Sequence, residues 1–380
     1  MSSSEVASPR IEWPTAIMFA VTSLVTLTAV PLYGWYNDFS TTAWVSAFLL
    51  WVYCGISIGS GYHRLWSHRT YQARGPMKVF FAIGGAFALQ NSILQWCARH
   101  RVHHRHVDVE EKDPHSIKLG VWYAHMGWML RDYEPGRADF STVPDLKRDP
   151  VVMWQHRNYW ALTWSMNIGV PALIGFIAGD FWGCLLLAGF ARLVLNHQVT
   201  FMINSLAHVW GKRPYTEENT ARDNWFLALL TCGEGYHNFH HKFEGDYRNG
   251  VRWWQIDLNK WFINACSWVG LCGEFKRTPK IQILRAKVKL QFERAQERLQ
   301  KQESGELSNF RETLDREYQQ FLETAKSWQE LQVQRVQKTR ADLQERWNAT
   351  AVRTRMRELE YSLKMQRKRI KVMVAALPVA

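Results

Sequence analysis

The sequence predicts an all-α integral membrane protein with four transmembrane helices in two hairpins, followed by a charged helical tail. Two pairs of long apolar segments, almost free of charged residues, indicate the membrane helices. The net charge of +13 is unevenly placed, because the region from Lys280 to Lys371 holds 22 Lys and Arg against 13 Asp and Glu. All 14 His and 18 of the 20 Trp precede Lys280. We therefore expect the chemistry in the membrane part and most of the excess charge in the tail.

The apolar segments set the predicted spans at residues 14–37, 40–62, 158–180 and 181–207. Each reaches the length of about 20 residues that a helix needs to cross the hydrocarbon core. Asp38 and Asp180 interrupt the apolar pattern within each pair, so we expect the hairpins to turn there. These lengths disfavour the alternative of two helical hairpins buried in a soluble protein.

A fifth apolar segment, residues 77–97, is interrupted by Lys78, Gln90, Asn91 and Gln95. These polar residues make a fifth membrane crossing unfavourable. The segment is therefore predicted to form one helix that lies at the membrane interface or caps the site.

Basic residues predict the orientation of the spans. Lys and Arg are absent between Ile11 and His63 and between Asn158 and Ala191, whereas the remaining segments outside the spans are basic. By the positive-inside rule, both termini and the middle segment face the cytoplasm. The favoured location is a bacterial inner membrane rather than the endoplasmic reticulum. The six Cys form no C-x-x-C pair, which fits reduced, buried thiols.

The predicted organisation is a cytosolic segment (1–13), a membrane domain (14–279) and a helical tail (280–380). In the tail, apolar residues recur every seven positions, with a second series between them, and Gly305 marks a predicted break. This heptad-like stripe suits a coiled coil, self-association or docking on a partner, although a solvated amphipathic helix also fits. The stripe consists of Leu307, Leu314, Phe321 and Trp328, with Phe310, Tyr318, Ala325 and Leu331. Nucleic acid is not an expected partner, because the aromatic residues do not alternate with the basic ones.

Histidines form three clusters at the predicted cytoplasmic border of the membrane. One follows the second span, one follows segment 77–97, and one follows the fourth span. Within the second and third clusters, spacings of three and four residues place imidazoles on one face of a helix. Neutral imidazole binds iron, zinc, copper and nickel. The clusters are His63 and His68; His100, His103 and His104; and His237, His240 and His241.

The fourth span carries a polar stripe with a spacing of four residues: Arg192, Asn196, Thr200, Asn204 and His208. Such a stripe inside a membrane is expected to face a cavity or a partner. The stripe ends level with the clusters. Nine histidines plus Asn204 exceed the ligands of one tetrahedral metal ion, so we expect two ions. An apolar substrate offers only unactivated C–H bonds, which favours iron with O2 as co-substrate.

With these clusters the sequence resembles the membrane-bound fatty acyl desaturases of the stearoyl-CoA (delta-nine) type, over about residues 14–277. The match includes Asn204-Ser205-Leu206-Ala207-His208 and Asp113-Pro114-His115. The resemblance implies a four-helix stem under a cytosolic helical cap that holds a non-haem di-iron site. The implied ligands are His63, His68, His100, His103, His104, His208, His237, His240 and His241, with Asn204 acting through a water. We expect no catalytic residue beyond these ligands.

The implied reaction uses O2 and two electrons to introduce a cis double bond, with delta-9 as the expected position, into a saturated acyl chain. Because no haem-binding or iron–sulfur module is visible, the electrons are expected from a separate donor of the ferredoxin, rubredoxin or cytochrome type with its reductase. The implied substrate contacts are Gln90, Asn91, Trp96, Arg157 and Trp210. Acyl-CoA members of the family carry an Arg-Asp pair before the second cluster, where this chain has Ala98-Arg99. A phospholipid-bound acyl chain therefore stays open beside acyl-CoA.

Two other functions remain compatible with the sequence. A membrane di-iron hydroxylase of an alkyl or lipid substrate would use a similar histidine set. A metal-stabilised membrane scaffold would instead recruit partners through the tail. Around the ligands, the sequence offers Asp108, Asp113 and Glu234 as acceptors of imidazole N–H groups and His115 as an orienting group. His197 is expected to serve helix packing.

Overall fold

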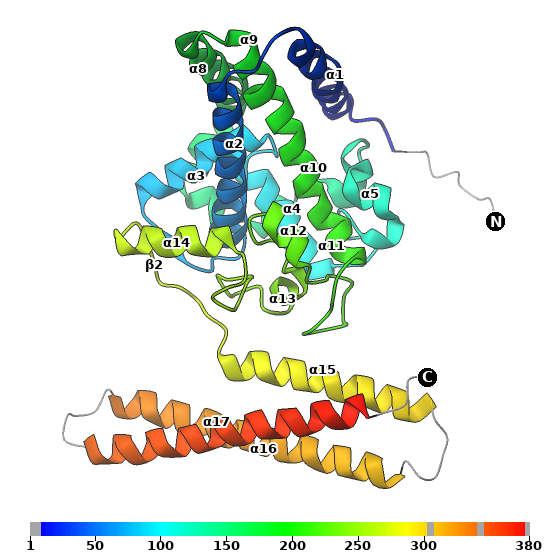
Figure 1. Ribbon diagram of the computed structural model, residues 1–380, viewed down its shortest axis with the longest axis vertical. Helices are drawn as coiled ribbons and strands as arrows, with labels where there is room; N and C mark the ends of the chain where they lie inside the picture. The colour runs from blue at the N-terminus through cyan, green and yellow to red at the C-terminus, as the bar shows by residue number, and fades with distance from the viewer. Residues whose placement is uncertain (1–8, 302–307, 340–345, 377–380) are drawn as a thin grey trace. The chain divides into compact units, whose positions relative to one another are not determined.

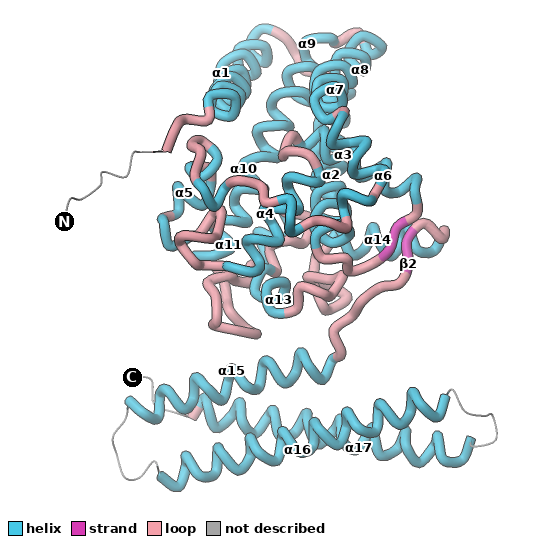
Figure 2. The backbone as a smooth tube through the Cα atoms, turned by 180° about the vertical axis from the view of Figure 1, so that it is seen from behind, coloured by secondary structure: helices cyan, strands magenta, loops and turns pink. Residues whose placement is uncertain are grey.

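The computed structural model describes residues 9–301, 308–339 and 346–376. These residues form two compact units, and helices dominate both (Figures 1 and 2). The first unit runs to Arg213 and resumes over Glu218–Arg277, while the second comprises Pro214–Glu217 and Thr278–Ala380. Each unit has a hydrophobic core of its own.

The first unit contains the membrane helices and the segments that carry the histidines. Its helices are α1 (Trp13–Tyr36), α2 (Thr41–Ile56), α3 (Gly75–Ala88), α4 (Ile93–His106), α5 (Val121–His125), α6 (Pro150–Arg157), α7 (Tyr159–Trp164), α8 (Val170–Ala178), α9 (Phe181–Cys184), α10 (Arg192–Asn204), α11 (Leu206–Val209), α12 (Trp225–Leu230), α13 (His237–Lys242) and α14 (Leu258–Trp268). Three π-helical stretches, η1 (Ser57–Ser67), η7 (Ser165–Gly169) and η8 (Leu185–Ala191), continue or join these helices. Short 3₁₀ turns are η2 (Ile117–Leu119), η3 (Gly127–Met129), η4 (Glu134–Gly136), η5 (Phe140–Thr142) and η6 (Leu146–Arg148).

The described residues form one small sheet, in which β1 (Gln72–Ala73) pairs antiparallel with β2 (Cys272–Gly273). Gln72 lies opposite Gly273, and Ala73 lies opposite Cys272. Figure 2 shows the two strands together beside α14. The pairing joins the segment after the first histidine cluster to the end of the first unit.

Four helical segments are long and apolar enough to cross a membrane, which confirms the number predicted. They cover Trp13–Tyr36, Thr41–Ser67, Tyr159–Ala178 and Phe181–Val209, with 24, 27, 20 and 29 residues. The second segment extends beyond its predicted end because α2 continues as the π-helix η1, which carries His63. The wider turn of a π-helix is frequent at functional sites. Large apolar side chains of α1 are exposed, such as Leu27 and Trp35, as a lipid-facing helix requires.

The turn at Asp180 ties three membrane helices together. Its carboxylate accepts hydrogen bonds from the Tyr33 hydroxyl (2.9 Å), the Ser40 backbone N–H (3.0 Å) and the Gly183 backbone N–H (2.9 Å). These donors come from α1, from the residue before α2, and from α9. A single charged residue at the turn therefore fixes the ends of all three helices.

The prediction of one helix over residues 77–97 is wrong. The chain forms α3 and α4 instead, and their axes differ by 82°. Leu89 and Asn91 adopt positive φ values of 48° and 73°, which end the first helix. The Ser92 side chain then accepts a hydrogen bond from the Gln95 backbone N–H and begins the second helix. Because of this bend, α4, which carries the second histidine cluster, runs in a different direction from α3.

The polar stripe of the fourth span faces the protein interior. Arg192 is buried and donates hydrogen bonds to the carbonyls of Ala188 and Phe87 and to the Asn167 side chain. His197 lies next to this stripe and contacts the Ala88 carbonyl at 3.0 Å. Both residues therefore anchor α10 to the end of α3, and the packing role expected of His197 is confirmed.

The second unit is a bundle of three helices, α15 (Lys280–Lys301), α16 (Ser308–Thr339) and α17 (Arg346–Ala375). Residues of the predicted stripe, including Leu314, Phe321 and Ala325, are buried against apolar residues of α15 and α17. The predicted helical tail thus forms three helices, which cover the stripe within one chain. Leu307 and Gly305 lie outside the described residues, and self-association stays a prediction.

A substitution in the bundle core is expected to loosen the tail alone. Phe321 is fully buried, and Phe321→Ala should cost about 3–5 kcal/mol of the unfolding free energy of the bundle. Limited proteolysis of the whole protein should then cleave the tail faster, while Gln319→Ala on the exposed face of the same helix should not change the rate. Equal cleavage rates for the two variants would contradict this assignment of the core.

Candidate metal centre

Nine histidines gather in two adjacent groups whose nitrogen atoms, within each group, lie within 4.8 Å of one another. The five-histidine group contains His63, His68, His100, His104 and His240. The four-histidine group contains His103, His208, His237 and His241. These are the nine histidines proposed from the sequence, so the structure brings the three clusters and His208 together.

Two short helices supply ligands to both groups. On α4, His100 and His104 are four residues apart and turn to the five-histidine group, whereas His103 turns to the other. On α13, His240 turns to the five-histidine group, and His237 and His241 turn to the four-histidine group. Because the histidines are three and four residues apart, each helix contributes rings to both groups.

The distances between ring nitrogens fit ligands of a common metal ion. In the five-histidine group, Nε2 of His240 lies 2.8 Å from Nε2 of His63 and 3.0 Å from Nε2 of His104. In the four-histidine group, Nε2 of His241 lies 3.1 Å from Nε2 of His237. Two imidazole nitrogens bound at right angles to one ion, each at about 2.1 Å, are about 3 Å apart. The observed spacings agree with this geometry.

Protonation also suits metal binding. Burial, with the neighbouring imidazoles, lowers the pKa of His240 and His241 well below the ordinary value for histidine. Burial likewise lowers the pKa of His104 to about 4. These rings are therefore neutral at pH 7 and have lone pairs available for a metal. In the described part of the chain, the buried Nε2 of His208 has no hydrogen-bond partner, as expected for an atom that binds an ion.

Carboxylates proposed from the sequence contact the outward nitrogens of two rings. His63 Nδ1 lies 2.7 Å from Glu234 Oε2, and His103 Nδ1 lies 2.8 Å from Asp113 Oδ1. These contacts confirm the partners proposed from the sequence. A carboxylate beside Nδ1 keeps the proton there and directs the Nε2 lone pair to the metal.

Two further partners were missed from the sequence. His104 Nδ1 lies 3.0 Å from Glu244 Oε2, and Glu244 lies just beyond the end of α13, so only its closeness in sequence to the third cluster could have indicated it. His208 Nδ1 contacts the Thr220 hydroxyl at 2.7 Å, and that hydroxyl donates to Asp108 at 2.8 Å. Asp108 therefore orients a histidine through Thr220 rather than directly.

Local charges keep the buried carboxylates ionised. Burial alone raises the pKa of Glu234, but the charge of Arg64 and the contact with His63 lower it to about 2. For Asp113, burial raises the pKa, and its contact with His103 more than offsets this, so its pKa lies well below the usual range. Both groups are therefore anionic acceptors at neutral pH.

Of the expected substrate residues, one lies beside the histidines and two lie at the bend between α3 and α4. The Trp96 ring stacks on His100, with 4.7 Å between centroids, which places it beside the five-histidine group. At the bend between α3 and α4, Gln90 donates to the Thr200 hydroxyl at 2.9 Å, and the Asn91 backbone N–H donates to the Tyr159 hydroxyl at 2.9 Å.

The remaining expected residues are more peripheral or sit at helix ends. Arg157 is exposed at the end of α6, and the exposed Trp210 ring meets Phe226. Asn204 is half-buried on the last turn of α10, four residues before His208. Their functional roles stay predictions.

Three of the histidines outside the two groups have other partners. His115 lies 3.8 Å from Asp113 and its ring centroid is 4.2 Å from that of His103, which fits the expected orienting role. His125 contacts the Ser205 hydroxyl at 2.9 Å, and His156 contacts the Ser92 hydroxyl at 2.7 Å. Each contact supports local structure.

Replacing Asp113 should weaken the four-histidine group. In Asp113→Asn the His103 ring loses its anionic partner, and metal affinity should fall about 10–100-fold. Metal retained against a chelator measures this change. Asp246→Asn is a matched control, because Asp246 is also buried but pairs with Arg248. Equal retention in the two variants would contradict the role of Asp113.

Comparison with known proteins agrees with this geometry. The family model described as "Fatty acid desaturase" matches residues 39–266. A "Probable acyl-CoA desaturase" of Schizosaccharomyces pombe is 43% identical over 259 residues, which cover 68% of this chain and 54% of the relative. "Acyl-CoA desaturase 1" of Saccharomyces cerevisiae is 41% identical over 262 residues, covering 67% and 51%. "Stearoyl-CoA desaturase 5" of Bos taurus is 37% identical over 247 residues, covering 62% and 73%. The chain thus spans about half the length of the two yeast relatives.

Proposed function

Because this chain belongs to the fatty acid desaturase family, we propose that it is a membrane-bound fatty acyl desaturase that introduces a cis double bond into a saturated acyl chain. The observation that carries the proposal is the convergence of nine histidines in two groups. The names of the Bos taurus relatives favour stearoyl-CoA as substrate. Delta-9 is the position of the double bond that the sequence resemblance implies.

The nine histidines would hold two iron ions, with Asn204 acting through a water. Two bound iron ions would supply the activation of O2 that an unactivated C–H bond requires. The chain itself binds the ions and fixes its imidazole tautomers through Glu234, Asp113, Glu244 and Thr220. The partial burial of the five-histidine group and the deeper burial of the four-histidine group limit the access of water.

The acyl chain would approach the metals beside Trp96, which stacks on His100. Gln90, Asn91, Arg157 and Trp210 are the further proposed substrate contacts. Names of the relatives favour an acyl-CoA carrier. The Arg-Asp pair of acyl-CoA members is absent, and Arg99 donates to the Gly136 carbonyl at 2.7 Å, so phospholipid remains the second candidate carrier.

The protein is an integral membrane protein, and the finer topology belongs to the proposal. Two transmembrane hairpins would place both termini and the histidines on the cytoplasmic side. The relatives named above are eukaryotic, so they give no support to the expected bacterial inner membrane. A separate donor of the ferredoxin, rubredoxin or cytochrome type would supply the electrons.

Expression in a host that lacks unsaturated fatty acids tests this function. The wild-type chain should restore growth, and mass spectrometry of free, CoA-linked and phospholipid pools should locate the double bond and its first carrier. A variant with His104→Ala serves as the inactive control, because it removes one ligand of the five-histidine group. An absence of double bonds from all three pools, or an added hydroxyl in place of a double bond, would contradict the proposal.

A further inference from the structure

A buried charged network lies behind the five-histidine group. The Arg64 guanidinium, 1% exposed, contacts Glu234 at 2.8 Å and Asp257 at 2.9 Å. It also donates to the Tyr247 carbonyl at 2.9 Å. Arg64 directly follows His63 on η1, whereas its partners come from segments on either side of the third histidine cluster. One side chain thus joins elements that are distant in sequence.

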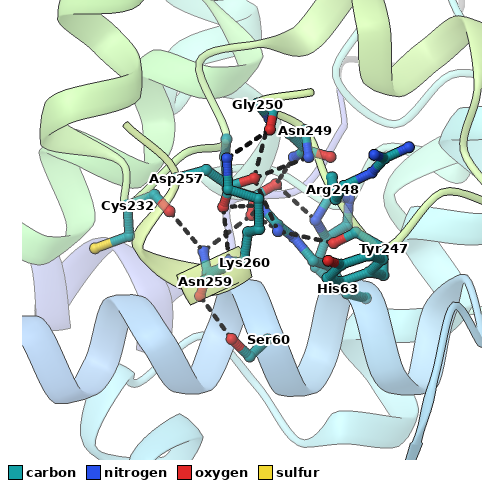
Figure 3. Close-up of polar contacts among 12 residues, drawn as sticks. Ser60, His63, Cys232, Tyr247, Arg248, Asn249, Gly250, Asp257, Asn259 and Lys260 are labelled. Carbon is teal, nitrogen blue, oxygen red and sulfur yellow. Dashed lines mark hydrogen bonds and ion pairs between the residues drawn. The ribbon is translucent and has the colours of Figure 1, made fainter. Parts of the chain in front are cut away.

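The outer part of this network, farther from the histidines, is organised by Asp257. Its fully buried carboxylate accepts backbone N–H groups of Asn249 (2.9 Å), Gly250 (3.0 Å) and Lys260 (2.9 Å). Figure 3 shows the loop residues Asn249 and Gly250 and the helix residue Lys260 gathered round it. The Lys260 ammonium donates to the Gly250 carbonyl at 2.7 Å. Asp257 therefore holds the loop that precedes α14 in one conformation.

The inner part of the network holds Glu234. Its two oxygens accept the side-chain N–H groups of Asn249 (2.7 Å) and Asn259 (3.0 Å) in addition to those of Arg64. The Asn259 oxygen in turn accepts the Ser60 hydroxyl of η1 at 2.8 Å. A Cβ atom at Gly59 would collide with the Asn259 amide, so glycine is needed for this close approach.

The charges of the network are balanced. Arg64 and Lys260 offset Glu234 and Asp257, and all four side chains are buried. Such a group is stable only when every charge keeps its partner, because an unpaired buried charge is strongly unfavourable. The arrangement therefore leaves Glu234 a single orientation, with Oε2 2.7 Å from His63 Nδ1.

We propose that Arg64 and Asp257 are positioning residues that set the spacing between the first and third histidine clusters in the five-histidine group. They fix Glu234, which fixes the His63 ring and directs Nε2 toward His240, 2.8 Å away. In the four-histidine group, the outward nitrogens of His103 and His208 contact Asp113 and Thr220 instead, so these two rings do not depend on this network. The proposal rests on the proposed function only in taking the histidines as metal ligands.

Selective loss of one metal ion is the test. The conservative variants Arg64→Lys and Asp257→Asn remove the guanidinium fork or one charge, and Asn249→Ala removes a single donor to Glu234 as a milder change. The purified full-length proteins would be loaded with ⁵⁷Fe, challenged with a chelator and followed by iron content and Mössbauer spectroscopy. We expect one of the two ions to bind about 10–100-fold more weakly, with the other retained.

Arg192→Lys is the matched control, because Arg192 is equally buried in a membrane helix and donates to Phe87 and Asn167 but has no contact with Glu234. It should keep both ions. The proposal is overturned if Arg64→Lys, Asp257→Asn and Asn249→Ala keep both ions at wild-type affinity, or lose both equally, or behave like Arg192→Lys. These measurements need no substrate. The positioning proposal can therefore fail while the desaturase activity holds, and it can hold while the desaturase activity fails.

Discussion

Replacement of His240 by alanine should abolish product formation, with a loss of about 1,000-fold or more, which corresponds to about 4 kcal/mol. His240 is the central ring of the five-histidine group, because its Nε2 atom lies within 3.0 Å of the Nε2 atoms of both His63 and His104. Its removal would take away one proposed metal ligand and leave a gap that water can enter. Product formation and iron content of the purified variant measure the effect.

His197→Ala is the matched control for this substitution. His197 is also a buried histidine, but it contacts the carbonyl oxygen of Ala88 and belongs to neither group. The control should retain iron and most of the activity, although helix packing is weakened. Full activity of His240→Ala, or equal loss of iron in both variants, would remove His240 from the set of ligands.

Removal of the metal should have an equally large effect. Chelation should abolish product formation, iron should restore it, and zinc should bind without restoring it. The histidines offer nitrogen ligands that suit several metals, so the nitrogens alone do not select iron. Zinc has no redox chemistry and cannot use electrons from a donor.

Circular dichroism of the metal-free protein is the control for unfolding. The helices should persist, because the rings are neutral and the carboxylates behind them keep their partners. An active zinc-loaded protein would show that the site does not act through redox chemistry.

The sequence predicted the membrane helices and the histidines because both leave strong local patterns. An apolar run of more than 20 residues has few structural alternatives, and spacings of three and four residues place rings on one helix face. These patterns were sufficient to propose all nine histidines that converge. His208 was found because it continues a polar stripe along the fourth span.

Features that depend on backbone conformation or on distant contacts were not predictable in the same way. The bend between α3 and α4 arises where Leu89 and Asn91 adopt positive φ values, yet neither residue is glycine. The link from Thr220 to His208 joins residues of different segments and leaves no periodic signal. Arg64 appeared to be one of many basic residues at the membrane border, and only its partners Glu234 and Asp257 reveal its position.

The tail shows how one pattern can serve several structures. A heptad-like stripe satisfies a coiled coil between chains and a bundle within one chain equally well. In the described residues, α15 and α17 cover the stripe of α16. The periodicity alone does not encode which of the two forms the chain adopts.

The most direct test of the central claim is a reaction of the purified, iron-loaded protein with stearoyl-CoA, O2 and a reduced electron donor. Mass spectrometry of the released fatty acid measures its change in composition. The account predicts a product that has lost two hydrogen atoms and gained no oxygen, with a cis double bond. A product that has gained oxygen, or no product from protein with both metal sites filled with iron, would contradict it.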